Sequence, residues 1–237
     1  MPLAYKRVLL KLSGEVLAGE HRFGIDPAIT GSIADEIAEI HASGVEIAIV
    51  IGGGNMVRGA SAQGVSRVAG DAMGMLATVI NSIALSESLC SRNVASQVMT
   101  AVRLDRTGEY YTPERAVKLL NSGSVVIIGG GTGNPFFTTD TAAALRCAEI
   151  GADVLMKATK VDGIYDCDPV GNPDAVRFDT ISHADALARK LKVMDATAFS
   201  FCMENDIPII IFKLLERGNL RRCIEGNRVG SIVKTGG

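Results

Sequence analysis

The stretch Val45–Asn55, which reads VEIAIVIGGGN, decides the fold class of this chain. Val45–Ile51 is apolar except for Glu46 and rich in β-branched residues, which is typical of a strand buried on both faces. Three glycines, Gly52–Gly54, follow at once. A buried strand that runs into a glycine turn is characteristic of the parallel sheets of α/β proteins.

The same pattern occurs upstream, where Arg7–Leu12 predicts a buried strand that runs into Ser13-Gly14. Between the two strands, Asp26-Pro27 predicts a helix start, with Asp as the cap and Pro at the first helical position. Gly44 would end this helix. Its apolar face consists of isoleucines that recur at helical spacing: Ile29, Ile33, Ile37 and Ile40.

Strands and helices continue to alternate downstream. We predict helices over Asp71–Leu89, Thr112–Gly123 and Thr138–Ile150, and strands over Gln97–Val102, Ser124–Ile128 and Val154–Lys157. The strand at Ser124–Ile128 also ends in a glycine-rich run, Gly129–Gly133. This alternation predicts an α/β fold, a three-layer αβα sandwich with a mostly parallel central sheet.

The last third of the chain is less regular. Asp162–Pro173 is rich in Asp, Gly and Pro and predicts a loop or hairpin. Helices are expected over Ser182–Leu191 and Met194–Asn205, and closing strands over Ile207–Phe212 and Val229–Val233. With no linker or repeat in the sequence, we expect one domain over residues 1–237, with lobes of about 1–150 and 151–237.

Composition excludes several classes of protein. Of the 237 residues, 47% are apolar and 21% charged, with a net charge of −2, so neither a basic nucleic-acid surface nor a polybasic membrane face is expected. No apolar run approaches the roughly 20 residues that span a bilayer. The five cysteines are scattered, without a CxxC, which argues against disulfides and zinc and favours the cytoplasm.

Three glycine turns at strand ends favour a phosphate ligand, because glycine lets backbone N–H groups approach a phosphate closely. Ordinary turn chemistry is the alternative. A P-loop is absent, since Gly-Lys never occurs, and neither Gly52 nor Gly129 opens a GxGxxG motif. Lys11 beside Ser13-Gly14, and Arg58 after the second turn, are candidate phosphate partners. Four acids are either metal or lysine partners or simple caps: Asp140, Asp162, Asp168 and Asp195.

Several longer segments carry a family resemblance. They are Lys11–Glu15 (KLSGE), Gly52–Asn55 with Arg58-Gly59, Gly70-Asp71 with Met73–Thr78, Thr132–Asp140 (TGNPFFTTD), Lys157–Gly163 (KATKVDG) and Lys192–Asp195. With them the chain resembles bacterial uridylate kinases of the amino-acid-kinase superfamily along nearly its whole length. The resemblance implies the amino-acid-kinase fold and phosphorylation of UMP to UDP by ATP, through direct in-line transfer.

The resemblance also implies roles for individual residues. The implied catalytic residues are Lys11, Arg58 and Asp195. The implied ATP site comprises Lys11, Leu12, Ser13, Gly14, Gly54, Arg58, Thr159, Tyr165 and Asp168. The implied UMP site comprises Gly53, Asp71, Thr132, Gly133, Asn134, Pro135, Phe136, Phe137, Thr138 and Thr139.

Cofactor, assembly and regulation are implied in the same way. We expect Mg²⁺ delivered as Mg-ATP without direct protein ligands, a homohexamer, inhibition by UTP and GTP as a candidate activator, with no nucleic acid and no membrane as partner. The segment implied in regulation is Gly19, Glu20, His21, Arg22, Phe23 and Gly24. Cys90, Gln97 and Ser124 stand where family members hold GTP with basic residues, so we expect weak or altered activation.

Three other functions remain open at this stage. A carboxylate kinase of the same superfamily, such as an acetylglutamate kinase, would share Lys11 and the GGGN turn but leaves TGNPFFTTD unexplained. A molybdenum storage protein would need clusters of His and acids, whereas His21, His41 and His183 are isolated. A Rossmann-like binding module accounts for the strands but not for the cations.

Overall fold

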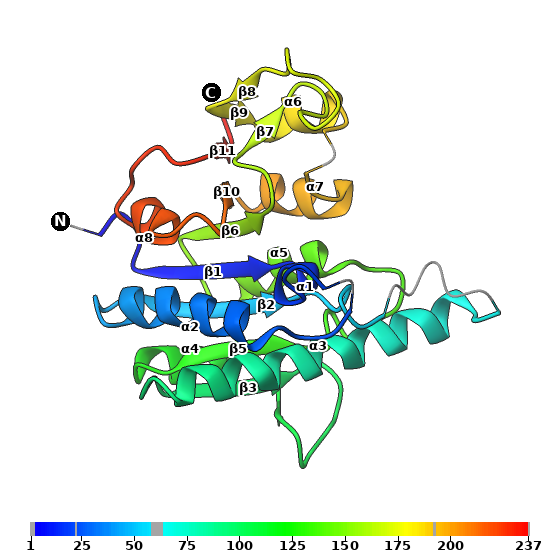
Figure 1. Ribbon diagram of the computed structural model, residues 1–237, viewed down its shortest axis with the longest axis vertical. Coiled ribbons are helices and arrows are strands. Elements are labelled where there is room, and N and C mark those ends of the chain that lie inside the picture. The colour runs from blue at the N-terminus through cyan, green and yellow to red at the C-terminus, as the bar shows by residue number, and fades with distance from the viewer. Residues whose placement is uncertain (1–2, 22, 58–63, 192, 237) are drawn as a thin grey trace.

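A nine-stranded sheet forms the centre of the computed structural model, which describes residues 3–21, 23–57, 64–191 and 193–236 (Figure 1). The strands are β1 Arg7–Leu12, β2 Glu46–Ile51, β3 Ser96–Thr100, β4 Glu109–Tyr110, β5 Val125–Gly129, β6 Val154–Thr159, β7 Ile164–Tyr165, β8 Arg177–Phe178, β9 Thr180–Ser182, β10 Ile209–Lys213 and β11 Ser231–Lys234. The sheet order is β4-β3-β5-β2-β1-β6-β10-β11-β9, and β7 and β8 form a separate antiparallel pair.

Strand β1 lies at the middle of this sheet and pairs in parallel with both neighbours, β2 and β6. In this register Lys11 is opposite Val50 on one side and Lys157 on the other. Within the sheet, the pairing of β10 with β11 is antiparallel and the other pairings are parallel. The prediction of a mostly parallel sheet is confirmed.

Helices cover both faces of the sheet (Figure 1). They are α1 Gly14–Leu17, α2 Pro27–His41, α3 Arg67–Cys90, α4 Pro113–Asn121, α5 Thr139–Glu149, α6 His183–Ala188, α7 Ala196–Glu204 and α8 Asn219–Ile224. One buried cluster joins Leu10 to residues of α2, α3 and α8, and a second joins Leu9 to residues of α4, α5, α6 and α7. Successive residues of β1 therefore enter opposite cores, and the predicted three-layer sandwich is confirmed.

Local signals account for the start of α2. Asp26 accepts hydrogen bonds from the backbone N–H groups of Ala28 and Ile29, at 2.8 and 3.3 Å, and Pro27 takes the first helical position. These contacts satisfy two backbone donors that the helix leaves unpaired. The predicted cap and the predicted apolar face, with Ile33, Ile37 and Ile40 buried, are confirmed.

Other element boundaries differ from the prediction. Helix α3 begins at Arg67, with the Ser66 hydroxyl accepting from the N–H of Ala69 at 3.3 Å, so the predicted start at Asp71 is wrong by one turn. The loop predicted from Asp162 contains β7, whose partner β8 lies beyond Pro173. The short helices α1 and α8 were not predicted, because four and six residues are too few to show periodicity.

Helix α3 is also long and apolar enough to cross a membrane by length and composition, contrary to the expectation from the sequence. Its inner face, however, contributes Leu85 and Leu89, both 0% exposed, to the core beneath β2 and β5. The core helix of a soluble protein passes the same test of length and composition. Packing against the sheet accounts for the apolar composition of this inner face.

Candidate active site

The glycine turns predicted to bind phosphate follow three adjacent strands, β1, β2 and β5. The N–H of Gly52 donates to the carbonyl of Leu12 at 2.8 Å, which joins the first two turns. A Cβ placed on Gly14 would lie 2.4 Å from the carbonyl oxygen of Gly52, so only glycine fits there. The sheet order therefore brings the three turns to one edge, outside the carboxyl ends of the strands, where ligands of α/β sheets bind.

Lys11 and Lys157 converge on one carboxylate at this edge. The Nζ atom of Lys11 lies 2.7 Å from Oδ1 of Asp140, and Nζ of Lys157 donates to Oδ2 at 2.6 Å. Lys157 also donates to the carbonyl of Val193. Both lysines lie on the sheet face covered by α5, as Leu9 and Leu155 do two residues earlier, and Asp140 lies in the first turn of that helix.

Burial and charge have opposing effects on the carboxylate and on Lys157 in this cluster. Burial raises the pKa of Asp140, but the charges of Lys11 and Lys157 outweigh it and leave this pKa below its ordinary value. Burial lowers the pKa of Lys157, and the charge of Asp140 offsets part of that effect. The cluster thus brings two lysine side chains to one carboxylate at the edge of the sheet.

Asp195, which the resemblance implies is catalytic, lies at the start of α7. Its carboxylate caps α7, accepting from the N–H of Ala198 at 2.9 Å, and accepts from the hydroxyls of Thr138 at 2.5 Å and Thr141 at 3.1 Å. The carboxylate that forms ion pairs with Lys11 and Lys157 is that of Asp140. Asp195 therefore holds the N-terminal turn of α5, and Asp140 holds the lysines.

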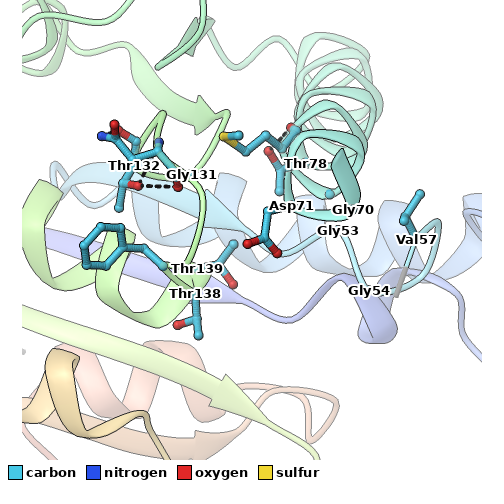
Figure 2. A pocket seen from close by; sticks show the side chains of 14 residues that line it. Gly53, Gly54, Val57, Gly70, Asp71, Thr78, Gly131, Thr132, Thr138 and Thr139 are labelled. Carbon is cyan, nitrogen blue, oxygen red and sulfur yellow. Dashed lines mark hydrogen bonds between the residues drawn. The ribbon is translucent and has the colours of Figure 1, made fainter. Parts of the chain in front are cut away.

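A cavity of about 140 Å³ lies between α3 and the segment that precedes α5, and one of its lining residues, Thr139, directly precedes Asp140 (Figure 2). Its lining includes seven residues predicted to bind UMP, namely Gly53, Asp71, Thr132, Asn134, Phe137, Thr138 and Thr139. Gly54, predicted on the ATP side, lines this cavity too. Gly133, Pro135 and Phe136 belong to the same segment but are not among its lining residues.

Asp71 is held by two contacts at the cavity wall. Its Oδ2 atom accepts from the backbone N–H of Phe136 at 2.8 Å and from Nε of Arg67 at 2.9 Å. These bonds, with that of Phe136 the larger, lower the pKa of Asp71. The carboxylate is therefore ionised at neutral pH and can accept hydrogen bonds from a ligand.

The remaining predicted ATP residues lie on the other side of β1, at the end of β6 and after it. Thr159 ends β6 and donates to the carbonyl of Val161 at 2.5 Å. Tyr165 in β7 donates to Asp162 at 2.7 Å, and Asp168 accepts from the N–H of Val170 at 3.0 Å. Leu12, Ser13 and Gly14 lie between these residues and the cavity, at the end of β1. Arg58, a predicted phosphate partner, lies outside the described residues, as does Lys192.

The predicted regulatory segment lies next to the glycine turns. Gly19, Glu20 and His21 line a second cavity of about 480 Å³ with Asn55 and Lys160, and Gly24 donates to the carbonyl of Asn55 at 3.0 Å. Phe23 is 69% exposed, and Arg22 lies outside the described residues. Three residues stand where, by the resemblance, family members hold GTP with basic side chains. They lie at the end of α3, in β3 and before β5: Cys90, Gln97 and Ser124.

The paired roles of Asp140 and Lys157 were not predicted from the sequence. Asp140 was one of four acids with no assigned partner, and Lys157 received no role. A signal was present, since each lysine interrupts an apolar strand directly after a buried residue. Only the strand order, with β6 beside β1, shows that the two side chains meet.

The sequence profile of the amino acid kinase family matches residues 6–213 of this chain. The chain belongs to the amino acid kinase family, and the predicted fold and kinase class are confirmed. Among solved structures it is similar to UMP kinase from Bacillus anthracis, at 37% identity and a TM-score of 0.96, over 98% of this chain and 97% of that one.

Two further UMP kinases extend this similarity. The enzyme from Ureaplasma parvum is 34% identical, with a TM-score of 0.91, over 99% of this chain and 100% of that one. The uridylate kinase from Archaeoglobus fulgidus is 28% identical, with a TM-score of 0.75, over 95% and 99% of the two chains. The resemblance to uridylate kinases inferred from the motifs is confirmed.

Proposed function

We propose that this protein transfers the γ-phosphate of ATP to UMP and produces UDP. The observation that carries the proposal is the cluster of Lys11, Lys157 and Asp140 at the carboxyl ends of β1 and β6, beside a cavity lined by Asp71. The similarity to UMP kinases along the whole chain supports UMP as the acceptor.

Two cations and the glycine N–H groups would offset the repulsion between the phosphates as they approach in line. Asp140 sets the positions of Lys11 and Lys157, because one carboxylate contacts both ammonium groups. Positioning and charge then account for the rate, and no covalent enzyme intermediate is needed.

The two substrates occupy opposite sides of β1 in this proposal. UMP binds in the N-terminal lobe, about 1–150, where Asp71 accepts from its ribose hydroxyls and Thr132–Thr139 surround the ribose and uracil. ATP binds in the C-terminal lobe, about 151–237, where Thr159, Tyr165 and Asp168 line the site for its base and ribose. Arg58 joins the phosphates in this proposal on the sequence resemblance alone.

Magnesium fits this donor set as a companion of ATP. Among the described residues, no group of three or more His, Cys, Asp and Glu side chains could hold a metal ion by itself. Mg²⁺ commonly keeps several waters and binds through substrate phosphates, with one or two carboxylates. When bound, it would neutralise charge on the phosphates of ATP. Asp195, partly exposed at the start of α7, is the residue we propose to hold its waters.

Assembly and regulation belong to the same proposal. The outer face of α3 exposes apolar side chains that a second copy would cover in a homohexamer: Met73, Leu76, Ile80 and Ile83. UTP would inhibit by competing for the UMP cavity, and GTP would activate weakly, with Gly19–Gly24 transmitting its signal. We place the enzyme in the cytoplasm.

A coupled assay of ADP release tests the proposal, with UMP and N-acetylglutamate as alternative acceptors. We expect release that depends on UMP and not on the amino acid. Release with N-acetylglutamate alone would assign a carboxylate kinase. Binding of ATP without UMP-dependent release would contradict phosphoryl transfer and favour nucleotide or oxoanion storage.

A further inference from the structure

Asn55 and Asn81 form a reciprocal pair of hydrogen bonds between their amide groups. Nδ2 of Asn55 donates to Oδ1 of Asn81 at 3.0 Å, and Nδ2 of Asn81 donates to Oδ1 of Asn55 at 2.7 Å. The two side chains are 2% and 0% exposed. Asn55 follows the glycine turn after β2, and Asn81 lies in the middle of α3, so the pair joins the turn to the helix.

Each amide uses its second hydrogen on the backbone. Asn81 donates to the carbonyl of Gly52 at 2.7 Å, and Asn55 donates to the carbonyl of Gly24 at 2.8 Å. The backbone of Asn55 in turn accepts from the N–H of Gly24 at 3.0 Å. All the amide hydrogens of the pair therefore have acceptors, which gives the pair one well-defined geometry.

This pair lies directly beneath the contact between the first two glycine turns. A Cβ placed on Gly14 would lie 2.6 Å from Oδ1 of Asn55 and 2.4 Å from the carbonyl oxygen of Gly52, the acceptor for Asn81. The turn after β1 thus rests on one asparagine and on a carbonyl that the other asparagine orients. A shift of either side chain would change the separation of the two turns.

We propose that Asn55 and Asn81 are positioning residues that set the separation of the two glycine turns, and hence of the phosphates of ATP and UMP. This inference rests on the proposed function. Apolar side chains would fill the same buried space and could match the stability of a polar pair. They could not orient the carbonyl of Gly52, and a misplacement of about 1 Å can cost roughly 100-fold in rate.

The test compares Asn81→Leu with Ser82→Ala by steady-state kinetics and thermal unfolding. Ser82 is the matched control, because it is 0% exposed, neighbours Asn81 on α3 and donates within the helix to the carbonyl of Thr78. We expect Asn81→Leu to lower kcat about tenfold or more while the KM values for ATP and UMP change less than about threefold. Ser82→Ala should keep the wild-type kcat.

A second variant separates positioning from stability. Replacing both asparagines with leucine removes the unpaired amide that the single substitution leaves, so the double variant should unfold at a higher temperature than Asn81→Leu. We expect its kcat to stay low, because the carbonyl of Gly52 still lacks its donor. Recovery of kcat together with stability would overturn the inference. If neither leucine variant folds, Asn81→Ser, which keeps one small donor, should show the same loss of kcat.

The outcomes also distinguish this inference from the proposed function. Wild-type kcat in folded Asn81→Leu or Asn81→Ser, with UMP-dependent turnover intact, would overturn the positioning role alone. Wild-type protein without any UMP-dependent turnover would overturn both.

Discussion

Lys11 and Lys157 occupy paired positions in adjacent parallel strands, and their ammonium groups contact the two oxygens of one carboxylate. Two lysines, 7% exposed and partly buried respectively, would repel each other without Asp140 between them. The arrangement keeps both cations beside the glycine turns, where a transferring phosphoryl group would need them.

Substituting Lys11 tests its electrostatic role. We expect Lys11→Ala to lower kcat at saturating ATP and UMP by roughly 100-fold or more, the scale of losing one donor to the transition state. The exposed Lys118 in α4 provides the control, since Lys118→Ala removes the same charge away from the site. Near wild-type kcat in folded Lys11→Ala would exclude Lys11 from the mechanism.

Asp71→Asn should weaken UMP far more than ATP. A hydrogen bond to a charged acceptor contributes about 1.5–3 kcal/mol, or roughly 10- to 150-fold in the KM for UMP. A capping role for Asp71 is contradicted by the position of Ser66 at the start of α3. The KM values for UMP and ATP, each measured at varied concentrations of that substrate, test the ribose contact. Asp105→Asn, at an exposed position, is the control. Equal increases in both KM values would argue against the ribose contact.

Asp140→Asn should destabilise the protein, because it leaves two buried lysines without their counter-charge. Breaking a buried pair in this way costs about 3–5 kcal/mol in the free energy of unfolding. The pKa of Asp140 is lowered in the folded state, so its stabilisation is present above pH 3.8 and is lost as the pH falls through the folded pKa.

Urea unfolding of the wild type and Asp140→Asn across this pH range measures the effect. The difference between them should be full at neutral pH and shrink in acid. A difference independent of pH would show that the lost stability does not come from this carboxylate.

Activity should depend absolutely on Mg²⁺. Mg²⁺ commonly keeps several waters and binds through substrate phosphates, so the ion should arrive with ATP. ADP release measured with excess chelator and again after adding Mg²⁺ checks this expectation. Full activity in the chelator would contradict it, and Asp195→Asn should raise the Mg²⁺ concentration needed for half-maximal rate.

Activation by GTP should be weak. Cys90, Gln97 and Ser124 supply no cation, and a triphosphate is held poorly without one. The nearby Arg92 forms an ion pair with Asp35 at 2.6 Å, and Arg103 lies over the ring of Tyr110.

A GTP titration at low UMP measures the response, with UTP as the comparison. UTP should inhibit competitively against UMP. Strong, saturable activation at micromolar GTP would show that other residues bind the effector.

Local chemistry made much of the fold predictable. The buried strands around Leu9 and Ile49 and the cap at Asp26 all depend on neighbours in sequence, and each was predicted. Much of the lining of the cavity that we propose for UMP lies in Thr132–Thr139, a contiguous segment that the sequence motifs had singled out.

The lysine cluster was harder to predict because it depends on strand order. Lys11, Asp140 and Lys157 are distant in sequence and meet only because β6 lies beside β1 and α5 begins next to both lysines. The Asn55–Asn81 pair was missed for the same reason, since the sequence contains no sign that α3 passes beneath the turn after β2. Asp195, which the resemblance implies is catalytic, accepts hydrogen bonds from Thr138 and Thr141, contacts that the sequence did not predict.

Transfer of label from ATP carrying a radioactive γ-phosphate tests directly whether this protein phosphorylates UMP and whether Lys11 takes part. The acceptors UMP, CMP, dUMP and N-acetylglutamate are compared, each with Mg²⁺, for the wild type and Lys11→Ala. We expect labelled UDP from UMP with the wild type, and a yield of labelled UDP that is at least roughly 100-fold lower with Lys11→Ala. Absence of labelled UDP from the wild type, or an equal yield from the folded Lys11→Ala variant, would contradict it.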